Sequence, residues 1–312
     1  MAFVIMACYR PVVAWKPLDG GAISFSEMKD CREIRIKCGQ CIGCRLERRE
    51  FWTIRCYLES KMHRDNCFVT LTYDEAHYPQ YGSLCYRDFQ LFAKRLRAKV
   101  GPFRFFMCGE YGDELDRPHY HALFFGLDFS DKYKCNSIRS SFAVYRSETL
   151  ESCWTHGFSS IGDVSYASAR YCAAYTTKKV TGDLADSYYS RVVSDTGEIV
   201  RLEPEFAHMS LRPGIGLPWL ERYWKDLYTK GHNAVIVNGE KKRIPRYFDR
   251  KMDEIVPLLM DEVEFERYNE SLKYSGDNTP DRLAVREQVE LARVAFNKDR
   301  LESKKCVTKL LP

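Results

Sequence analysis

The sequence predicts an α+β fold in which helices pack against an antiparallel sheet. Stretches rich in β-branched and aromatic residues predict strands at 67–73, 103–109 and 119–125. Between the first two strands, apolar positions at helical spacing predict a helix over 88–100. The last two strands are separated only by a short polar connection, so we expect them to pair as antiparallel neighbours.

Each of these elements has its own signal. The first strand reads CFVTLTY, a composition typical of a central strand. In the helix, Phe89, Phe92 and Leu96 form the apolar face, and Gly101 followed by Pro102 marks the end. The next connection, Gly109 to Asp113, is expected to be a turn that brings Glu110 near the third strand.

The following segment completes the pattern. We expect a short helix at Cys153 and Trp154, a fourth strand over 158–164, and a helix over 167–179 that Ser165 caps. The resulting order β-α-β-β-α-β-α describes an antiparallel sheet with helices against it, related in outline to ferredoxin-like and RRM-like folds.

Length and composition indicate a globular protein with additions around one core. The chain has 312 residues, 45% of them hydrophobic, and no stretch long enough to span a membrane, so we expect no membrane contact and no signal peptide. We expect an N-terminal segment at 1–65, a core domain at 66–182 and a C-terminal extension at 183–312. The extension ends in a charged, helix-prone tail over 261–305, and its role is not readable.

Thirteen cysteines without a secretory signal indicate reduced thiols in a cytosol-like compartment. The net charge of +5 is mild, but basic residues cluster in two places. Such clusters suit a phosphate backbone, although solvated helix faces explain the same charges equally well. The clusters comprise Lys94, Arg95, Arg97, Lys99 and Arg104, and then Lys241, Lys242, Arg243, Arg246, Arg250 and Lys251.

The most informative feature is a pair of histidines, His119 and His121, inside the third predicted strand. Side chains two apart in a strand project from the same face, so the two imidazoles lie side by side. With Glu110 nearby they form a two-histidine, one-carboxylate set that suits Mn²⁺ or Mg²⁺, and Zn²⁺ or non-haem iron also fits. The alternative is two half-buried histidines and a turn glutamate paired with Arg117.

A second set comprises Tyr171, Tyr175 and Lys178, which share one stripe of the predicted helix. A phenol is a weak nucleophile near its ordinary pKa of about 10, but a neighbouring cation and a polarised phosphate make it competent. The alternative is an aromatic stripe that packs into the core.

A third set, Cys38, Cys41 and Cys44, has the spacing of zinc ligands and lacks a fourth ligand in the same run. Alternatively, Cys41 and Cys44 are buried thiols in the first turn of a helix that includes 45–57. The candidates for the fourth ligand are Cys8, Cys31 and Cys56.

Three of these segments, taken in order, resemble the motifs of rolling-circle replication initiators, the HUH endonucleases. They are Thr70 to Tyr73, Pro118 to His121, and Tyr171 to Lys178. Paired tyrosines resemble the microvirus type, and Lys37 to Arg48 and Met209 to Gly216 resemble the replication-associated proteins of gokushoviruses, which are single-stranded DNA phages of bacteria. The resemblance runs from about residue 8 to about residue 216. One departure is that Lys178 is phased for Tyr175, whereas the residue three after Tyr171 is Ala174.

The resemblance implies a metal-dependent, site-specific endonuclease of single-stranded DNA. Its metal ligands would be Glu110, His119 and His121. Its nucleophiles would be Tyr171 and Tyr175, either of which can start, with Lys178 as an assisting cation. Tyrosine attack at an origin would leave a 5′-phosphotyrosine and a free 3′-hydroxyl, and a second transfer would rejoin the ends and release a circle.

The resemblance also implies partners. A host DNA polymerase would extend the 3′-hydroxyl, and a host helicase would unwind the duplex, because the chain carries no phosphate-binding loop for ATP. The compartment would be the host bacterial cytoplasm. The expected DNA contacts are Thr70, Thr72, Arg95, Arg97 and Lys179. Cys8 is the favoured fourth ligand of a structural Zn²⁺, since Cys8-Tyr9-Arg10-Pro11 resembles the start of the phage proteins.

Two other functions remain open from the sequence. A transposase or plasmid relaxase would use the same chemistry in another setting. A zinc-containing nucleic-acid-binding module without catalysis would bind DNA with strong salt dependence and form no covalent adduct.

Overall fold

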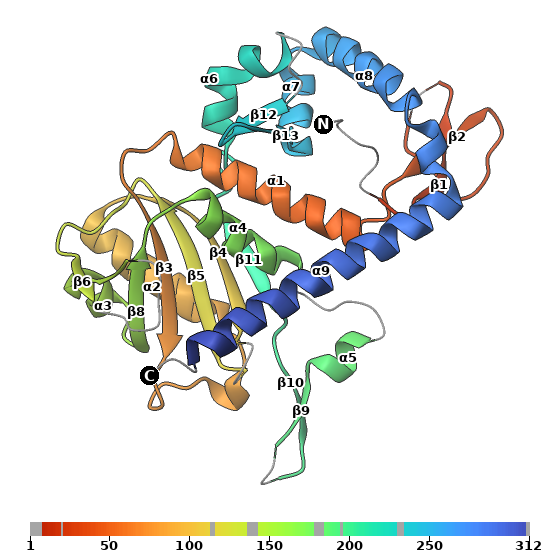
Figure 1. The fold of residues 1–312 in the computed structure, drawn as a ribbon. Helices are drawn as coiled ribbons and strands as arrows, with labels where there is room; N and C mark the ends of the chain where they lie inside the picture. The colour runs from red at the N-terminus through yellow and green to blue at the C-terminus, as the bar shows by residue number, and fades with distance from the viewer. Residues whose placement is uncertain are drawn as a thin grey trace. The chain divides into compact units, whose positions relative to one another are not determined.

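The structure is a computed structural model that describes residues 8–19, 21–112, 116–135, 143–177, 184–193, 196–229 and 234–309, with side chains to residue 297 (Figure 1). Its contacts divide the chain into two compact units, one formed by Met1–Arg48 with Asp253–Pro312 and the other by Arg49–Met252. The functional division that we expected at residues 65 and 182 stays a prediction. Within the described ranges, no helix is both long enough and apolar enough to cross a membrane.

The larger unit is built on a seven-stranded antiparallel sheet in the order β11-β4-β5-β3-β8-β7-β6. The prediction of an antiparallel sheet with helices against it is confirmed, and the four predicted strands correspond to β3, β4, β5 and β8. The strands are β3 (Asn66–Tyr73), β4 (Arg104–Tyr111), β5 (Pro118–Phe125), β6 (Tyr133–Cys135), β7 (Val144–Arg146), β8 (Gly157–Gly162) and β11 (Phe206–Met209).

One face of the sheet is covered by α2 (Tyr86–Val100) and α3 (Glu148–Cys153). Strand residues that alternate along β3 and β5 project to this side, among them the buried Leu71 and Phe124. They pack against Phe92 of α2 and against Trp154, whose indole nitrogen donates to the carbonyl of Thr72 at 3.0 Å. This apolar layer is the main core of the unit.

The other face is covered by α4 (Tyr166–Ala174) and by the part of α1 (Ile42–Ser60) that belongs to this unit. Here Phe106 and Leu123 from the sheet pack with Cys56 of α1 and Cys172 of α4. Ser165 caps α4 as predicted, and its side chain accepts from the backbone of Ser168. Polar residues that project from the sheet on this side therefore lie beside α4.

Two local predictions were wrong at their boundaries. Glu110 lies inside β4, where it pairs with His119 of β5, because the ladder between the two strands continues to Tyr111 and Pro118. The last helix of the core ends at Ala174 and continues as the 3-10 turn η2 (Tyr175–Thr177). The hydroxyls of Thr176 and Thr177 donate to the carbonyls of Ala173 and Ala174, which competes with regular α-helical bonding.

The remaining elements lie outside this central layer. The charged tail predicted to be helical is confirmed as such. In the smaller unit, β1 (Val12–Pro17) pairs with β2 (Cys31–Ile36), and the C-terminal part forms α8 (Pro257–Leu272), η3 (Ser275–Asn278) and α9 (Pro280–Lys309). The other elements are η1 (Gln80–Gly82), α5 (Leu184–Tyr188), β9 (Ser190–Val192), β10 (Ile199–Arg201), α6 (Leu217–Tyr228), β12 (Ala234–Val237), β13 (Glu240–Arg243) and α7 (Arg246–Ile255).

A buried carboxylate, Glu59, joins α1 to the sheet and to the segment before α6. One of its oxygens accepts from Arg104 of β4 at 2.5 Å, and the other accepts from the backbone of Gly216 at 2.6 Å. The Arg104 guanidinium also donates to the carbonyl of Pro213 at 2.8 Å. The segment that ends at Gly216 is therefore held to the core by charged hydrogen bonds.

We expect Glu59→Gln to lower the free energy of unfolding by about 2 to 4 kcal/mol, since the change leaves the largely buried Arg104 guanidinium without a carboxylate. Urea unfolding monitored by fluorescence would measure the loss. The control is Glu75→Gln, which removes a carboxylate that is 84% exposed and paired with Arg117, so we expect a change within about 1 kcal/mol. Equal losses in the two variants would contradict the role given to burial.

Candidate active site

Glu110 and His119 face each other across β4 and β5, and His121 follows two residues later on the same face. One carboxylate oxygen, Glu110 Oε1, lies 2.6 Å from His119 Nε2 and 2.9 Å from His121 Nε2. The ligand atoms of the three residues all lie within 4.8 Å of one another. The structure thus brings together the three residues that the sequence singled out, and they could hold a metal ion.

Hydrogen bonds on the far side of each imidazole orient its Nε2 toward Glu110. His119 Nδ1 lies 3.0 Å from the carbonyl oxygen of Arg117, which can only accept, so this nitrogen donates and Nε2 keeps its lone pair. His121 Nδ1 lies 2.9 Å from the hydroxyl of Thr70. Metal-binding histidines are usually held by such outer contacts, so the donor set fits a divalent cation.

The His121 ring is also held by stacking. It lies between the rings of Phe68, at 5.5 Å and 10°, and Tyr175, at 5.8 Å and 19°. Sequence reasoning missed the role of Phe68, although alternation along β3 places Phe68, Thr70 and Thr72 on the face of the histidines. Thr70, which we expected only as a DNA contact, also orients His121.

The charge of Glu110 is stabilised where it lies. Burial works against its ionised form, but hydrogen bonds from His119 and His121 outweigh burial and lower the pKa of Glu110 to about 2. The carboxylate is therefore ionised at neutral pH, which is the state that binds a cation.

Both tyrosines of α4 and η2 reach this group. The Tyr171 hydroxyl lies 3.3 Å from His121 Nε2 and 3.5 Å from Glu110 Oε1, and the two tyrosine rings are 5.1 Å apart. Tyr171 is 45% exposed, whereas Tyr175 is 5% exposed. Burial and then the negative charge of Glu110 raise the pKa of each phenol, so both are protonated in this arrangement.

The other residues expected around the site are less close or not described. Lys178 and Lys179 lie outside the described residues. Thr72 is on the histidine face, where its hydroxyl donates to the carbonyl of Phe158 at 3.3 Å. Arg95 and Arg97 belong to α2, which packs on the opposite face of the sheet.

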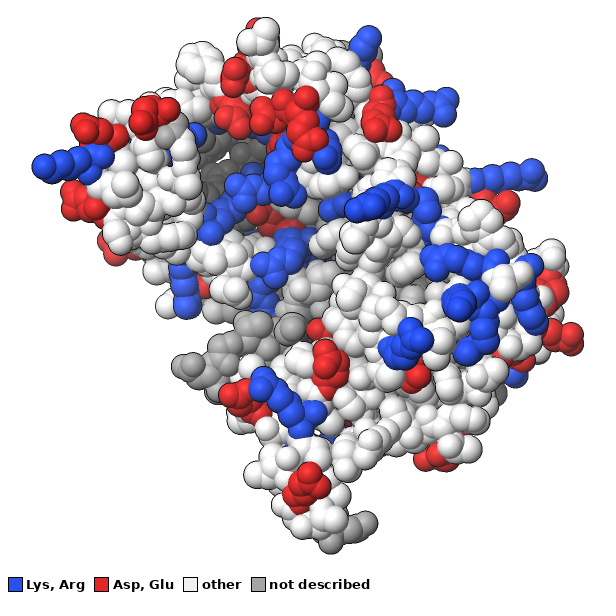
Figure 2. All heavy atoms as spheres, turned by 180° about the vertical axis from the view of Figure 1, so that it is seen from behind, with Lys and Arg blue, Asp and Glu red and all other residues white. Residues whose placement is uncertain are grey.

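On that opposite face, α2 carries an exposed basic surface. Figure 2 shows Lys and Arg side chains gathered where α2 lies, as seen from behind the view of Figure 1. Arg95 and Arg97 each have a partner within the protein: Arg95 Nε donates to the carbonyl of Cys153 at 2.9 Å, and the Arg97 guanidinium lies over the Phe103 ring. Their assignment as DNA contacts stays a prediction.

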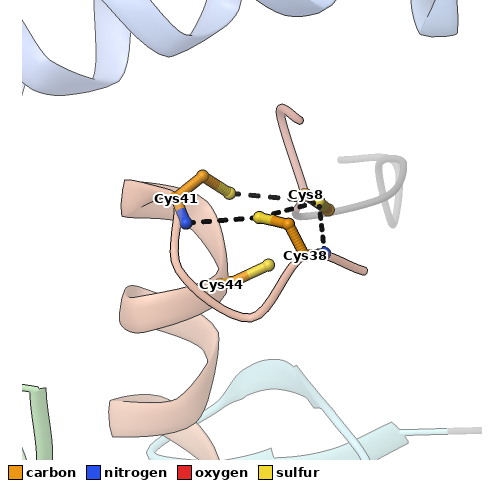
Figure 3. Close-up of side chains that lie close together, drawn as sticks. All are labelled: Cys8, Cys38, Cys41 and Cys44. Atoms are coloured by element: carbon orange, nitrogen blue, oxygen red, sulfur yellow. Dashed lines mark hydrogen bonds between the residues drawn. The ribbon is translucent and has the colours of Figure 1, made fainter. Parts of the chain in front are cut away.

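The smaller unit contains a second group of metal-binding side chains. The sulfurs of Cys8, Cys38, Cys41 and Cys44 all lie within 4.8 Å of one another, and Figure 3 shows them converging at the start of α1. The Cys8 and Cys38 sulfurs are 3.6 Å apart, and those of Cys41 and Cys8 are 4.0 Å apart. Cys31, in β2, is not part of the group.

The thiols of this group differ in acidity. Burial opposes ionisation of Cys38, but hydrogen bonds from the backbone of Cys41 and Gln40 outweigh it and lower its pKa to about 7. Burial raises the pKa of Cys8 and of Cys44. A cation would therefore have to stabilise the thiolate forms of these two residues.

Comparison with known proteins gives a consistent result. Residues 66–180 match the family model of the replication-associated protein ORF2. The chain is similar to the replication-associated protein VP4 of Bdellovibrio phage phiMH2K, with 34% identity over 255 residues that cover 78% of this chain and 76% of the relative. No solved structure matches the chain.

Two further relatives carry similar names. Replication-associated protein ORF2 of Spiroplasma virus 4 is 29% identical over 276 residues, which cover 80% of this chain and 81% of the relative. Replication-associated protein ORF4 of Chlamydia phage 1 is 29% identical over 248 residues, which cover 75% of this chain and 57% of the relative.

Proposed function

This chain belongs to the replication-associated proteins of microviruses, and from that premise we propose that it initiates rolling-circle replication by nicking one DNA strand at an origin. The observation that carries the proposal is the convergence of a phenol and three metal-binding atoms on one point. The Tyr171 hydroxyl lies within 3.5 Å of both His121 Nε2 and Glu110 Oε1, and His119 Nε2 contacts the same carboxylate oxygen.

We propose Mg²⁺ or Mn²⁺ as the cation of this site, held by Glu110, His119 and His121. A carboxylate and two imidazoles leave coordination positions open, which suits a site where phosphate oxygens must also bind. When bound, such a cation supplies positive charge to the phosphate and makes it a better electrophile.

The residues of the chain perform the transfer itself. The phenol oxygen of Tyr171 forms a bond to phosphorus while the bond from phosphorus to the 3′ oxygen breaks. The phenol gives up its proton, and the departing oxygen takes one up and leaves as a free 3′-hydroxyl. The phosphodiester is exchanged for a phosphotyrosine at the 5′ end, so no nucleotide cofactor is consumed.

Tyr175 provides the second transfer in this proposal. While one tyrosine holds the old 5′ end, the other cleaves the regenerated origin, and the new 3′-hydroxyl attacks the first phosphotyrosine to close a circle. Tyr171 is the more exposed of the two, so we assign it the first attack. Lys178, three residues after Tyr175, is proposed to offset charge on the phosphate.

We propose that the chain works with host enzymes in the bacterial cytoplasm. A DNA polymerase extends the 3′-hydroxyl, and a helicase opens the duplex. Single-stranded DNA at the origin is the substrate, with Thr70, Thr72 and Lys179 among the proposed contacts. Arg95 and Arg97 would contact DNA only where the strand passes the opposite face of the sheet.

The experiment that tests the proposal uses single-stranded oligonucleotides that tile the replicon from which the chain comes, incubated with the protein and Mn²⁺ or Mg²⁺. Mass spectrometry should find protein carrying the downstream fragment on Tyr171 or Tyr175, and the upstream fragment should be extendable by a polymerase. Binding of these oligonucleotides without any adduct would instead support a non-catalytic nucleic-acid-binding module.

We also propose that Cys8, Cys38, Cys41 and Cys44 hold a structural Zn²⁺. A tetrahedral zinc site with sulfur ligands places its sulfurs about 3.8 Å apart. The separations of 3.6 and 4.0 Å in the group are close to that value. Four thiolates close the coordination shell, so the ion would stabilise the fold and take no part in the nicking reaction.

We expect the purified chain to contain about one zinc ion and Cys44→Ser to lose most of it, together with several degrees of thermal stability. Elemental analysis and thermal melting would measure both. The matched control is Cys31→Ser, which changes a thiol of β2 outside the group and should keep the zinc. Zinc content that is the same in the two variants would exclude these ligands.

A further inference from the structure

Phe158 exposes a large apolar ring on the same sheet face as the candidate active site. In β8 it pairs with Thr72 of β3, and Thr72 in turn pairs with His119 of β5. Directly opposed residues of an antiparallel ladder project from the same face, so Phe158, Thr72 and His119 form one row across three strands. The Phe158 side chain is 62% exposed, whereas its neighbours Ser159 and Ile161 are buried.

The backbone holds Phe158 firmly in this position. A Cβ atom on the preceding Gly157 would lie 2.4 Å from the backbone nitrogen of Asp74 and 2.5 Å from the carbonyl oxygen of Thr72, so only glycine permits this approach. On the other side, the Thr72 hydroxyl donates to the Phe158 carbonyl at 3.3 Å. An exposed ring fixed in this way loses little conformational freedom when a ligand binds.

The surface around the ring is polar and carries no stacking partner from the described part of the chain. Ser160 of β8 pairs with Thr70 of β3, which places two hydroxyl-bearing residues in the next row of the same face. Among the described residues, no aromatic ring lies in stacking contact with Phe158. Two strand spacings, about 10 Å, separate the backbone of Phe158 from that of His119.

We propose that Phe158 is a base-stacking platform for single-stranded DNA, and that it holds a nucleobase close to the phosphate that is cut. The inference rests on the proposed function, because the triad marks where that phosphate binds. Aromatic rings on sheet faces bind single strands by stacking, and hydroxyl groups beside them can hydrogen-bond to base edges or sugars. Stacking alone accepts any base, so Phe158 supports binding and register, and sequence choice falls to neighbouring polar groups.

The test measures binding of oligo-dT that contains one 2-aminopurine, whose fluorescence falls when the base stacks. The parent protein is the full-length double variant Tyr171→Phe/Tyr175→Phe, which cannot form an adduct, so binding is separated from chemistry. We expect Phe158→Leu to weaken binding about 5- to 50-fold, because base stacking on an aromatic side chain contributes a factor of that size. The quenching at one 2-aminopurine position should also be lost.

Two further variants make the result specific. Phe158→Trp should restore both affinity and quenching, since it supplies another aromatic face. Phe265→Leu on α8 removes a ring that is 66% exposed in the smaller unit, and it should leave binding unchanged. Unchanged melting temperatures would show that each variant is folded.

The outcomes separate this inference from the proposed function. If Phe158→Leu binds within twofold of its parent, the stacking role is wrong even if the wild-type chain nicks DNA. If Phe158→Leu loses affinity but the wild-type chain forms no adduct with any origin oligonucleotide, the platform stands and the nicking proposal falls. If the parent does not bind oligo-dT at all, both are wrong.

Discussion

Tyr171→Phe is expected to slow formation of the covalent protein–DNA adduct by about a thousandfold or more, because it removes the attacking oxygen and leaves the ring in place. The Tyr171 hydroxyl is the phenol that contacts the triad, at 3.3 Å from His121 Nε2, and its side chain is open to solvent. The adduct would be quantified by intact-protein mass spectrometry over a time course with single-stranded origin DNA and Mn²⁺.

Tyr175→Phe provides the comparison within the same site. Tyr175 is nearly buried and stacks on His121, so we expect this variant to keep most of the first cleavage and to lose the joining of ends that releases a circle. The double variant should form no adduct. Cleavage that persists at the wild-type rate in Tyr171→Phe and disappears in Tyr175→Phe would reverse the assignment of the two tyrosines.

His119→Ala and His121→Ala are expected to lower metal-dependent nicking by about a hundredfold to ten thousandfold, while the affinity for single-stranded DNA changes less than about threefold. Each variant removes one of two neutral nitrogen ligands whose orientation the structure fixes, through Arg117 for His119 and through Thr70 for His121. Loss of one protein ligand from a three-ligand site weakens both metal binding and catalysis strongly.

Nicking rates at several Mn²⁺ concentrations and calorimetric titration with Mn²⁺ would measure the two effects together. The matched control is His77→Ala, since His77 is a half-exposed histidine that contacts Asp74 in the loop after β3. It should keep both the nicking rate and the metal affinity. A triad variant that nicks at the wild-type rate would leave the three residues with a purely structural role.

Much of the larger unit could be predicted from sequence because its strands alternate cleanly. In β3 and β5, apolar and polar side chains take opposite faces, and this alternation alone is enough to predict that His119 and His121 lie side by side. The flanking Gly109 and Gly112 predict a turn at Glu110, whereas the ladder with β5 carries the strand past it. The sequence therefore predicts the proximity of Glu110 to the histidines correctly but for the wrong local reason.

Other features needed the tertiary structure. Nothing in the spacing of Cys8 relates it to Cys38, since 29 residues separate them and only the fold brings their sulfurs within 3.6 Å. The exposure of Phe158 is also invisible in sequence, because a phenylalanine in a predicted strand is normally assigned to the core. Only the register with Thr72 places its ring on the open face beside the triad.

The division of the chain into Arg49–Met252 and a unit formed from both ends has a consequence for biosynthesis. A ribosome delivers residues in order, so the insert is complete and can fold while the C-terminal half of the outer unit is still missing. The cysteine group comes entirely from residues 8 to 44 and emerges first of all. The nascent chain can therefore assemble a metal-binding knot, then the sheet that carries the triad, and finally the helices that close the outer unit.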